Sequence, residues 1–489
     1  MTQFNETGDV GDNQYYLYKQ DIARIAALGV PYYSFSISWS RILPFGRGPV
    51  NELGLKHYED LIDTCLEYGV KPIVTLFHVG FFIFRPTINL LASLHTHVAN
   101  PIPPQWDLPL FLQNTYGGWL SPDIIDDFVN YADIIFKRYG NKVPHWFTVN
   151  EPHEYCGEYP LHSNLFTAVT IPPQQQPYYC IHHTLLAHAK TYHLSKSLGL
   201  NATISLKNNG GYKIPLTSSP EDAIAVQRAW DFNEGWCSNP IYVNGDYPAH
   251  LKAYVETIPL SFSDEEKALI NGTADFYAHD AYTSSYYRAP DGGIDACTSD
   301  SSHPLFPLCF IQLNVGPDGW LIGTPADPLA SWLHKAVDWV PTFLRYIQDT
   351  WPSKGGIFVS EFGFCLPFHL SIISPSTSSP YPNFPRFAEP FEAQKATLAD
   401  IRMDSTRATY YKEYMEAILM AISDGVNVAG SLAWTIMDNL EWSVGYHVKF
   451  GMQYVNFTSG ERYYKASFFE YVNAFKLYAE DPVVPVHVK

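Results

Sequence analysis

The sequence contains no run of about 18 apolar residues, the length that an α-helix needs to span a bilayer. It is also poor in charge, since Asp, Glu, Lys and Arg make up only 16% of its 489 residues. Positive charge is scarcest, because 31 Lys and Arg stand against 49 Asp and Glu. The net charge of −18 argues against nucleic acids and anionic membranes as partners, because an acidic surface repels both.

The N-terminus lacks the basic start and the apolar stretch of a signal peptide. Cysteines are few, and their number, seven, is odd. Cys297 and Cys309 nevertheless bracket a loop of a length that a disulfide permits. Four Asn-x-Ser/Thr sequons stand at Asn5, Asn201, Asn271 and Asn456. On balance these features favour secretion of the intact protein.

Aromatic residues are abundant, at 16% of the chain. We expect most of them to fill a large core. The others are suited to a site for sugars, whose apolar C–H faces stack on aromatic rings. Although 489 residues would suffice for about three average domains, α/β barrels with long loops reach this length as one unit, and we expect a single domain over residues 1–489.

Short apolar strands alternate with amphipathic helices along the chain. Strands are predicted over Pro31–Trp39, Pro72–His78, His145–Asn150, Ala202–Lys207, Phe276–Thr283, Gly356–Glu361 and Val428–Trp434. Helices are predicted over Tyr15–Leu28, Gly54–Tyr68, Ile124–Tyr139, Tyr179–Leu198 and Thr406–Ser423. This alternation indicates the α/β class and a (β/α)8 TIM barrel. Only seven strands are found, and we expect the first strand to be missing from this sequence.

Two carboxylates end apolar runs that lie about two hundred residues apart. Glu151 occurs in Trp-Phe-Thr-Val-Asn-Glu-Pro, and Glu361 in Ile-Phe-Val-Ser-Glu-Phe-Gly. A residue at the carboxyl end of a barrel strand points into the mouth where such enzymes keep their active sites. Two carboxyl groups in one site are what glycoside hydrolysis requires. Either Glu could instead be a structural acid paired with an Arg.

Several ordered motifs resemble glycoside hydrolase family 1, the retaining β-glucosidases, and particularly its fungal members. They are Phe35–Pro44 (Phe-Ser-Ile-Ser-Trp-Ser-Arg-Ile-Leu-Pro), Thr75–His78, Trp106–Pro109, Gly117–Leu120, Thr148–Pro152 (Thr-Val-Asn-Glu-Pro), Asp438–Trp442 (Asp-Asn-Leu-Glu-Trp) and Lys449–Gly451. Nearly the whole chain takes part in the resemblance. It implies small β-glucosides, such as cellobiose or aryl and alkyl glucosides, as substrates.

The resemblance also implies roles for individual residues. Glu151 would be the general acid/base and Glu361 the nucleophile of a double displacement. The residues implied to bind substrate or to support the nucleophile are His78, Asn150, Tyr282, Trp434, Glu441, Trp442 and Phe450. Of these, Asn150 would bind the sugar 2-hydroxyl, and Tyr282 would donate to the nucleophile.

The chain departs from the family pattern at several positions. Ser34 replaces an Arg whose charge would lower the pKa of the nucleophile, Asp280 replaces an Asn, and Phe362 replaces the Asn after the nucleophile. With the first strand, we expect the sugar-binding Gln that the resemblance implies to be missing as well. We predict no cofactor and no metal, and we interpret Gly210-Gly211 as a turn rather than a phosphate loop.

Two segments interrupt the family motifs, Val79–Gln105 and Phe364–Arg386. Both leave the reading frame intact if they are excised, and we interpret them as translated introns. The alternative is that they are genuine surface loops or lids. With the missing first strand, these insertions predict that the chain as given is impaired.

Two other functions remain open at this stage. An endo-acting retaining glycanase of a related barrel family shares Asn-Glu-Pro and Glu-Phe-Gly, although Asp-Asn-Leu-Glu-Trp speaks against it. A non-catalytic remnant would result if the lost strand and the insertions disable the site. A comparison of the rates of hydrolysis of cellobiose and of a long polymer would distinguish the two enzymes, since an exo-acting enzyme prefers cellobiose and an endo-acting one prefers the polymer.

Overall fold

The structure is a computed structural model that describes residues 6–8, 10–78, 107–163, 170–365 and 397–479. The proposed insertion 79–105 lies outside the described residues. So does most of 364–386, of which only Phe364 and Cys365 are described, both buried.

Seven parallel strands form a sheet in the order β1-β2-β3-β4-β5-β9-β10, and β6 adds to β5 in antiparallel orientation. The strands of this sheet are β1 (Tyr32–Ser36), β2 (Lys71–Phe77), β3 (His145–Asn150), β4 (Thr203–Pro215), β5 (Tyr277–Arg288), β6 (Ile311–Leu313), β9 (Ile357–Phe362) and β10 (Val428–Ala433). Two small antiparallel pairs are β7 (Thr324–Pro325) with β8 (His334–Lys335), and β11 (Gln453–Val455) with β12 (Arg462–Tyr464).

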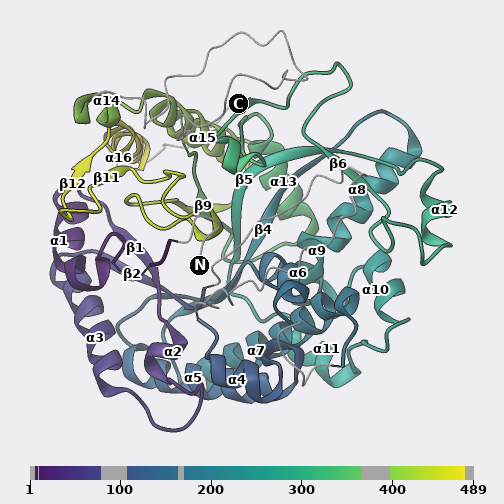
Figure 1. The fold of residues 1–489 in the computed structure, drawn as a ribbon, viewed down its shortest axis with the longest axis horizontal. Coiled ribbons are helices and arrows are strands. Elements are labelled where there is room, and N and C mark those ends of the chain that lie inside the picture. The colour runs from purple at the N-terminus through teal and green to yellow at the C-terminus, as the bar shows by residue number, and fades with distance from the viewer. Residues whose placement is uncertain (1–5, 9, 79–106, 164–169, 366–396, 480–489) are drawn as a thin grey trace, which may run out of the picture.

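Helices surround these central strands (Figure 1). The α-helices are α1 (Gln14–Ala27), α2 (Trp39–Ile42), α3 (Glu52–Glu67), α4 (Leu110–Tyr116), α5 (Asp123–Tyr139), α6 (Pro152–Ser163), α7 (Gln176–Ser197), α8 (Pro220–Phe232), α9 (Glu234–Asn239), α10 (Ala249–Val255), α11 (Asp264–Ile270), α12 (Ile294–Thr298), α13 (Val340–Thr350), α14 (Leu398–Arg402), α15 (Ser405–Ser423) and α16 (Ala466–Ala479). None of the described helices is both long and apolar enough to cross a membrane.

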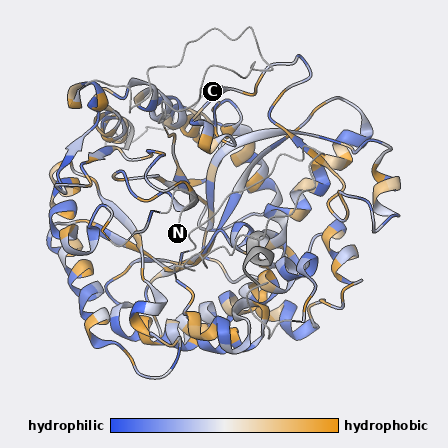
Figure 2. Cartoon of the chain, viewed as in Figure 1, coloured by the Kyte–Doolittle hydropathy of each residue, from blue (hydrophilic) through white to orange (hydrophobic). Residues whose placement is uncertain are grey.

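The sequence of α5 shows why such helices form and pack. Its buried positions Ile124, Phe128, Tyr131 and Ile135 recur at intervals of three or four residues and so lie along one face. Acidic residues occupy its first turn and basic residues its last, which suits the helix dipole. The helices of the outer ring accordingly carry both hydrophobic and hydrophilic residues (Figure 2).

The predicted alternation of strands and helices is confirmed, and the described residues form seven parallel strands, as predicted. β1 and β10 form the two edges of the sheet and do not pair with each other in the described part of the chain. Residues of both edges, Tyr33 and Ser34 from β1 with Leu432 and Ala433 from β10, line one cavity. The sheet is therefore a nearly closed barrel.

The interpretation of Gly210-Gly211 as a turn was wrong. Both glycines lie inside β4, which continues to Pro215 and pairs with β5 beyond a register shift. A side chain at Gly211 would place its Cβ 2.0 Å from the Thr283 carbonyl oxygen. Glycine here allows two backbones to approach closely rather than reversing the chain.

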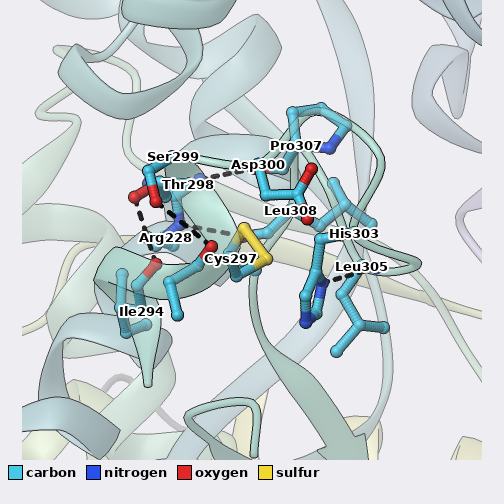
Figure 3. The surroundings of a disulfide bond; sticks show 12 residues. Arg228, Ile294, Cys297, Thr298, Ser299, Asp300, His303, Leu305, Pro307 and Leu308 are labelled. Atoms are coloured by element: carbon cyan, nitrogen blue, oxygen red, sulfur yellow. Dashed lines mark hydrogen bonds between the residues drawn. A yellow bond between two sulfur atoms is a disulfide. The ribbon is translucent and has the colours of Figure 1, made fainter. Parts of the chain in front are cut away.

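Two disulfides join Cys156 to Cys180 and Cys297 to Cys309. The second confirms the pairing suggested by loop length, whereas the first was not predicted. Figure 3 shows the bond of Cys297 beside Arg228, whose Nε donates to the carbonyl of Leu308 at 2.8 Å. This loop is thus fixed both covalently and by a side chain of α8.

Candidate active site

The ends of four parallel strands bring the two predicted carboxylates together. Glu151 follows β3 directly and has a left-handed φ of 43°. Its backbone N–H donates to the carbonyl of Lys207 on β4 at 3.0 Å. Glu361 lies near the end of β9, where Asp280 of β5 is its partner in the strand register. One carboxylate oxygen each of Glu151, Asp280 and Glu361 lies within 4.8 Å of the other two.

Three side chains lie against Glu361, from Lys207 on β4, Tyr282 on β5 and His78, which directly follows β2. Tyr282 OH donates to its Oε2 at 2.8 Å, as the resemblance implied. Lys207 Nζ donates to its Oε1, and His78 Nε2 lies 3.7 Å from that same oxygen. Both oxygens of the carboxylate therefore have fixed partners.

The pKa values of the two glutamates are shifted in opposite directions. Burial alone would raise the pKa of the Glu361 carboxyl, but the charge of Lys207 and the ring of His78 outweigh it and lower that pKa. Glu151 is half-buried. Burial and the negative charges of Asp280 and Glu361 raise its pKa well above the usual range. The opposite shifts suit the two glutamates to opposite roles, with Glu361 as the ionised partner and Glu151 as the protonated one.

Asp280 adds a third acid to this pair. Its Oδ1 accepts a hydrogen bond from Ser360 Oγ at 2.7 Å, and its Oδ2 lies 3.4 Å from Lys207 Nζ. Burial and the charge of Glu361 raise the pKa of Asp280 to about 7. The replacement of the expected Asn therefore places a titratable group beside both glutamates.

An aromatic wall stands on one side of the carboxylates. The His78 ring stacks with Trp442 and Trp434 at centroid distances of 5.4 and 6.0 Å. Trp434 Nε1 donates to Glu441 at 3.3 Å. Burial and the charge of Glu361 raise the pKa of Glu441 to about 8. The structure thus brings His78, Trp434, Glu441 and Trp442 together near Glu361.

A cavity of 280 Å³ opens at this wall. Of the predicted site residues, His78, Glu361, Trp434 and Trp442 line it, together with Lys207. The other predicted residues, Asn150, Glu151, Tyr282, Glu441 and Phe450, are not part of its lining. Two of them contact residues that line the cavity, since Tyr282 donates to Glu361 and Glu441 accepts from Trp434.

Asn150 and Phe450 are also close to the site. Asn150 ends β3, is buried, and its Oδ1 has no hydrogen-bond partner among the described residues. Phe450 is buried, with its ring centroid 6.4 Å from that of Tyr282. An acceptor without a partner next to the candidate acid is suited to a hydroxyl group of a ligand.

Lys207 is the main site residue that the sequence analysis missed. The signal was present, because Lys207 ends a predicted buried strand in the same way as the two glutamates do. A second missed residue is Asp107, whose Oδ2 accepts from the backbone N–H of His78 at 3.0 Å. Asp107 therefore holds the backbone at the end of β2 in place, although the two residues lie 29 positions apart in the sequence.

The three clustered carboxylates are also the only group of potential metal ligands in the described part of the chain. Lys207 Nζ already supplies a positive charge to two of them, Asp280 and Glu361. An ammonium group in that position competes with a metal ion for the same oxygens. The arrangement is thus better suited to proton transfer and nucleophilic attack than to holding a metal.

Comparison with known proteins agrees with this geometry. The family model "Glycosyl hydrolase family 1" matches residues 1–81, 89–304 and 391–477. β-Glucosidase 12 of rice is 31% identical over 478 residues, which cover 94% of this chain and 81% of the rice protein. β-Glucosidase 1B of Phanerodontia chrysosporium is 32% identical, with 94% and 76% of the two chains covered.

Solved structures give the same result. The β-glucosidase of Trichoderma harzianum superposes with a TM-score of 0.78 at 31% identity, covering 97% of this chain and 89% of that one. A rice β-glucosidase mutant in a covalent complex with Glc has a TM-score of 0.77 at 27% identity, with 96% and 90% covered. Paired carboxylates at the strand ends, the family match over most of the chain and these structural neighbours lead to one conclusion: the chain belongs to glycosyl hydrolase family 1.

Proposed function

We propose that the protein is a β-glucosidase that removes terminal β-D-glucosyl residues by a retaining double displacement. The observation that carries this proposal is the close pair of Glu151 and Glu361, whose oxygens lie within 4.8 Å and whose pKa values are shifted apart. Retaining glycosidases hold their carboxyl groups about 5–5.5 Å apart, whereas inverting enzymes leave about 6.5–9.5 Å for a water.

In the first step, the ionised Glu361 attacks the anomeric carbon while Glu151 gives its proton to the departing oxygen. The glycosidic C–O bond breaks, and an ester forms between the sugar and Glu361. Tyr282 and Lys207 orient the attacking carboxylate, since each holds one of its oxygens. The substrate needs no activation beyond the proton from Glu151.

In the second step, Glu151 acts as a base. Esterification removes the charge of Glu361, which is one cause of the raised pKa of Glu151. Glu151 is then ionised more readily and takes a proton from water, which attacks the anomeric carbon from the face that the leaving group vacated. The bond between the sugar and Glu361 breaks as the new C–O bond forms, which regenerates the Glu361 carboxylate. Two inversions give a product with the β configuration.

The remaining predicted residues form the sugar site in this proposal. Asn150 binds the 2-hydroxyl with its free Oδ1. Glu441 and His78 form hydrogen bonds with other hydroxyl groups of the sugar. Trp434 and Trp442 offer the surface on which the sugar ring stacks. Phe450 closes the wall behind Tyr282.

We also propose that the substrates are cellobiose and aryl or alkyl β-glucosides. In this proposal the protein is a β-glucosidase of the fungal type that takes part in cellulose degradation. Fungal β-glucosidases are among the similar proteins. We treat residues 1–489 as one catalytic domain, because the strands of a single sheet extend from Tyr32 to Ala433.

Mechanism-based labelling tests the proposed function. Incubation with an activated 2-deoxy-2-fluoro-β-glucoside is expected to add one fluoroglucosyl group to the protein, on the peptide that contains Glu361. A label on another carboxylate, or no label, would count against the assignment. Release of glucose from cellobiose but not of oligomers from a long polymer would support exo action over an endo-acting glycanase.

Removal of the two insertions is expected to increase activity. The first insertion begins after His78 and ends before Trp106. The next residue, Asp107, accepts a hydrogen bond from the backbone N–H of His78. The described residues on its two sides therefore meet at the active site. Both insertions begin close behind proposed site residues, His78 and Glu361. Because a displacement of about 1 Å in an active site can cost roughly a hundredfold in rate, we expect a gain of up to about that size.

The measurement is a side-by-side assay on an aryl β-glucoside of the chain as given and of a variant that lacks residues 79–105 and 364–386. Deletion of 79–105 alone serves as the intermediate variant. Full activity of the chain as given, with none gained on deletion, would mean that both segments are genuine loops.

A further inference from the structure

We infer that Lys207 is a positioning residue of the proposed reaction, whose ammonium group supplies the positive charge that holds the Glu361 carboxylate in place. It takes over the function of the cation that Ser34 cannot provide. The inference rests on the proposed role of Glu361 as the nucleophile.

Lys207 is built into the site rather than lying beside it. Its side chain is 2% exposed, and its Nζ reaches both Glu361 Oε1 and Asp280 Oδ2. The ammonium group also lies over the ring of Phe147, 5.4 Å from the centroid. At the same residue, the backbone carbonyl accepts from Glu151 N–H. One residue of β4 therefore contacts Glu151, Asp280 and Glu361, which together form the acid cluster of the site.

The charge balance of the cluster depends on this residue. Among the described residues, Lys207 is the only Lys or Arg that forms an ion pair with Glu361 or Asp280. Ser34, which lines the same cavity as Lys207 and Glu361, carries no charge. Without the ammonium group, the negative charges of Glu361 and Asp280 would lose a compensating cation, and the pKa of the Glu361 carboxyl would rise.

A protonated Glu361 could not attack the sugar. Lys207 therefore controls the fraction of molecules that are ready to react, in addition to the orientation of one carboxylate oxygen. After Glu361 is esterified, Asp280 remains as a partner for the ammonium group, so the positive charge is not left buried alone.

Two neutral variants, Lys207→Met and Lys207→Gln, test this inference. The rate of labelling by the activated fluoroglucoside is measured against pH. The labelling rate falls at low pH as Glu361 becomes protonated, and this fall is the acidic limb of the profile. Since only ionised Glu361 reacts, loss of the cation should move the acidic limb to higher pH by roughly 1–3 units. At pH values below the shifted limb, the variants should be labelled at least about tenfold more slowly than the unaltered chain. Gln keeps a hydrogen-bond donor without charge, and it provides a second neutral side chain if the Met variant does not fold.

Lys207→Arg and Lys213→Met are the matched variants. Arg retains the charge and should leave the acidic limb near its original position, even if its different length slows the reaction. Lys213 is a second buried lysine of β4, and it pairs with Glu234 instead. Its replacement by Met should lower the melting temperature without moving the acidic limb.

An unchanged acidic limb in folded Lys207→Met or Lys207→Gln, with Glu361 still labelled, would overturn the inference. An equal shift of the limb in Lys213→Met would also overturn it, because the effect would then be structural. If the unaltered chain is labelled elsewhere than on Glu361, it is the proposed function that fails instead.

Discussion

Replacement of Glu361 by Gly is expected to abolish formation of the glycosyl-enzyme while leaving glucose binding largely intact. The substitution removes the carboxylate that Tyr282 and Lys207 hold in place. Loss of a nucleophile in other hydrolases lowers kcat by roughly a millionfold, and we expect a loss of at least about 10⁴-fold here. Binding persists because the residues proposed to hold the sugar hydroxyls and to stack on the ring remain.

Intact-mass spectrometry after treatment with an activated fluoroglucoside checks this result, and calorimetry with glucose checks binding. Glu361→Gln serves as the matched variant, since it keeps the size of the side chain and removes only the charge. It should be equally unable to form the intermediate. A covalent adduct that still forms in either variant would show that another residue is the nucleophile.

The second large effect is expected for Glu151→Ala. Poor leaving groups need a proton as they depart, so kcat/KM for alkyl glucosides should fall by roughly 10²–10⁴-fold. Formation of the intermediate from dinitrophenyl glucoside, whose leaving group needs no proton, should change far less. Hydrolysis of the glycosyl-enzyme intermediate should then become the rate-limiting step, because no base remains to activate water.

Azide provides the diagnostic test of this variant. A small anion fits the space left by the carboxyl group and needs no base, so azide should accelerate turnover and yield β-glucosyl azide. Equal losses on all leaving groups, or an α-glucosyl azide, would contradict the role of Glu151 as the acid/base of a retaining enzyme.

Much of the fold could be predicted from the sequence because the signals are local. Apolar strands and amphipathic helices of regular length gave the alternation, and His145–Asn150 has the predicted bounds. β4 and β5 are longer than predicted, since they continue to Pro215 and Arg288. Their outer parts pair with each other, and such pairing between distant segments leaves no clear local pattern.

The site could be predicted where motifs were continuous. Glu151 and Glu361 were found from strand ends, and the contact between Tyr282 and Glu361 follows the family pattern. The role of Lys207 could not be read from motifs, because its significance depends on side chains from β5 and β9. The Ser at position 34, where the family has a cation, was visible in the sequence, whereas the ion pair of Lys207 with Glu361 became visible only in three dimensions.

The configuration of the first product tests the retaining mechanism most directly. Proton NMR is recorded during hydrolysis of an aryl β-glucoside, at enzyme concentrations high enough to outpace mutarotation. We expect β-glucose to appear first and the α anomer to follow only as the two equilibrate. If α-glucose appeared first, Glu361 could not act as the nucleophile of a double displacement, and the paired carboxylates would have to work by single inversion.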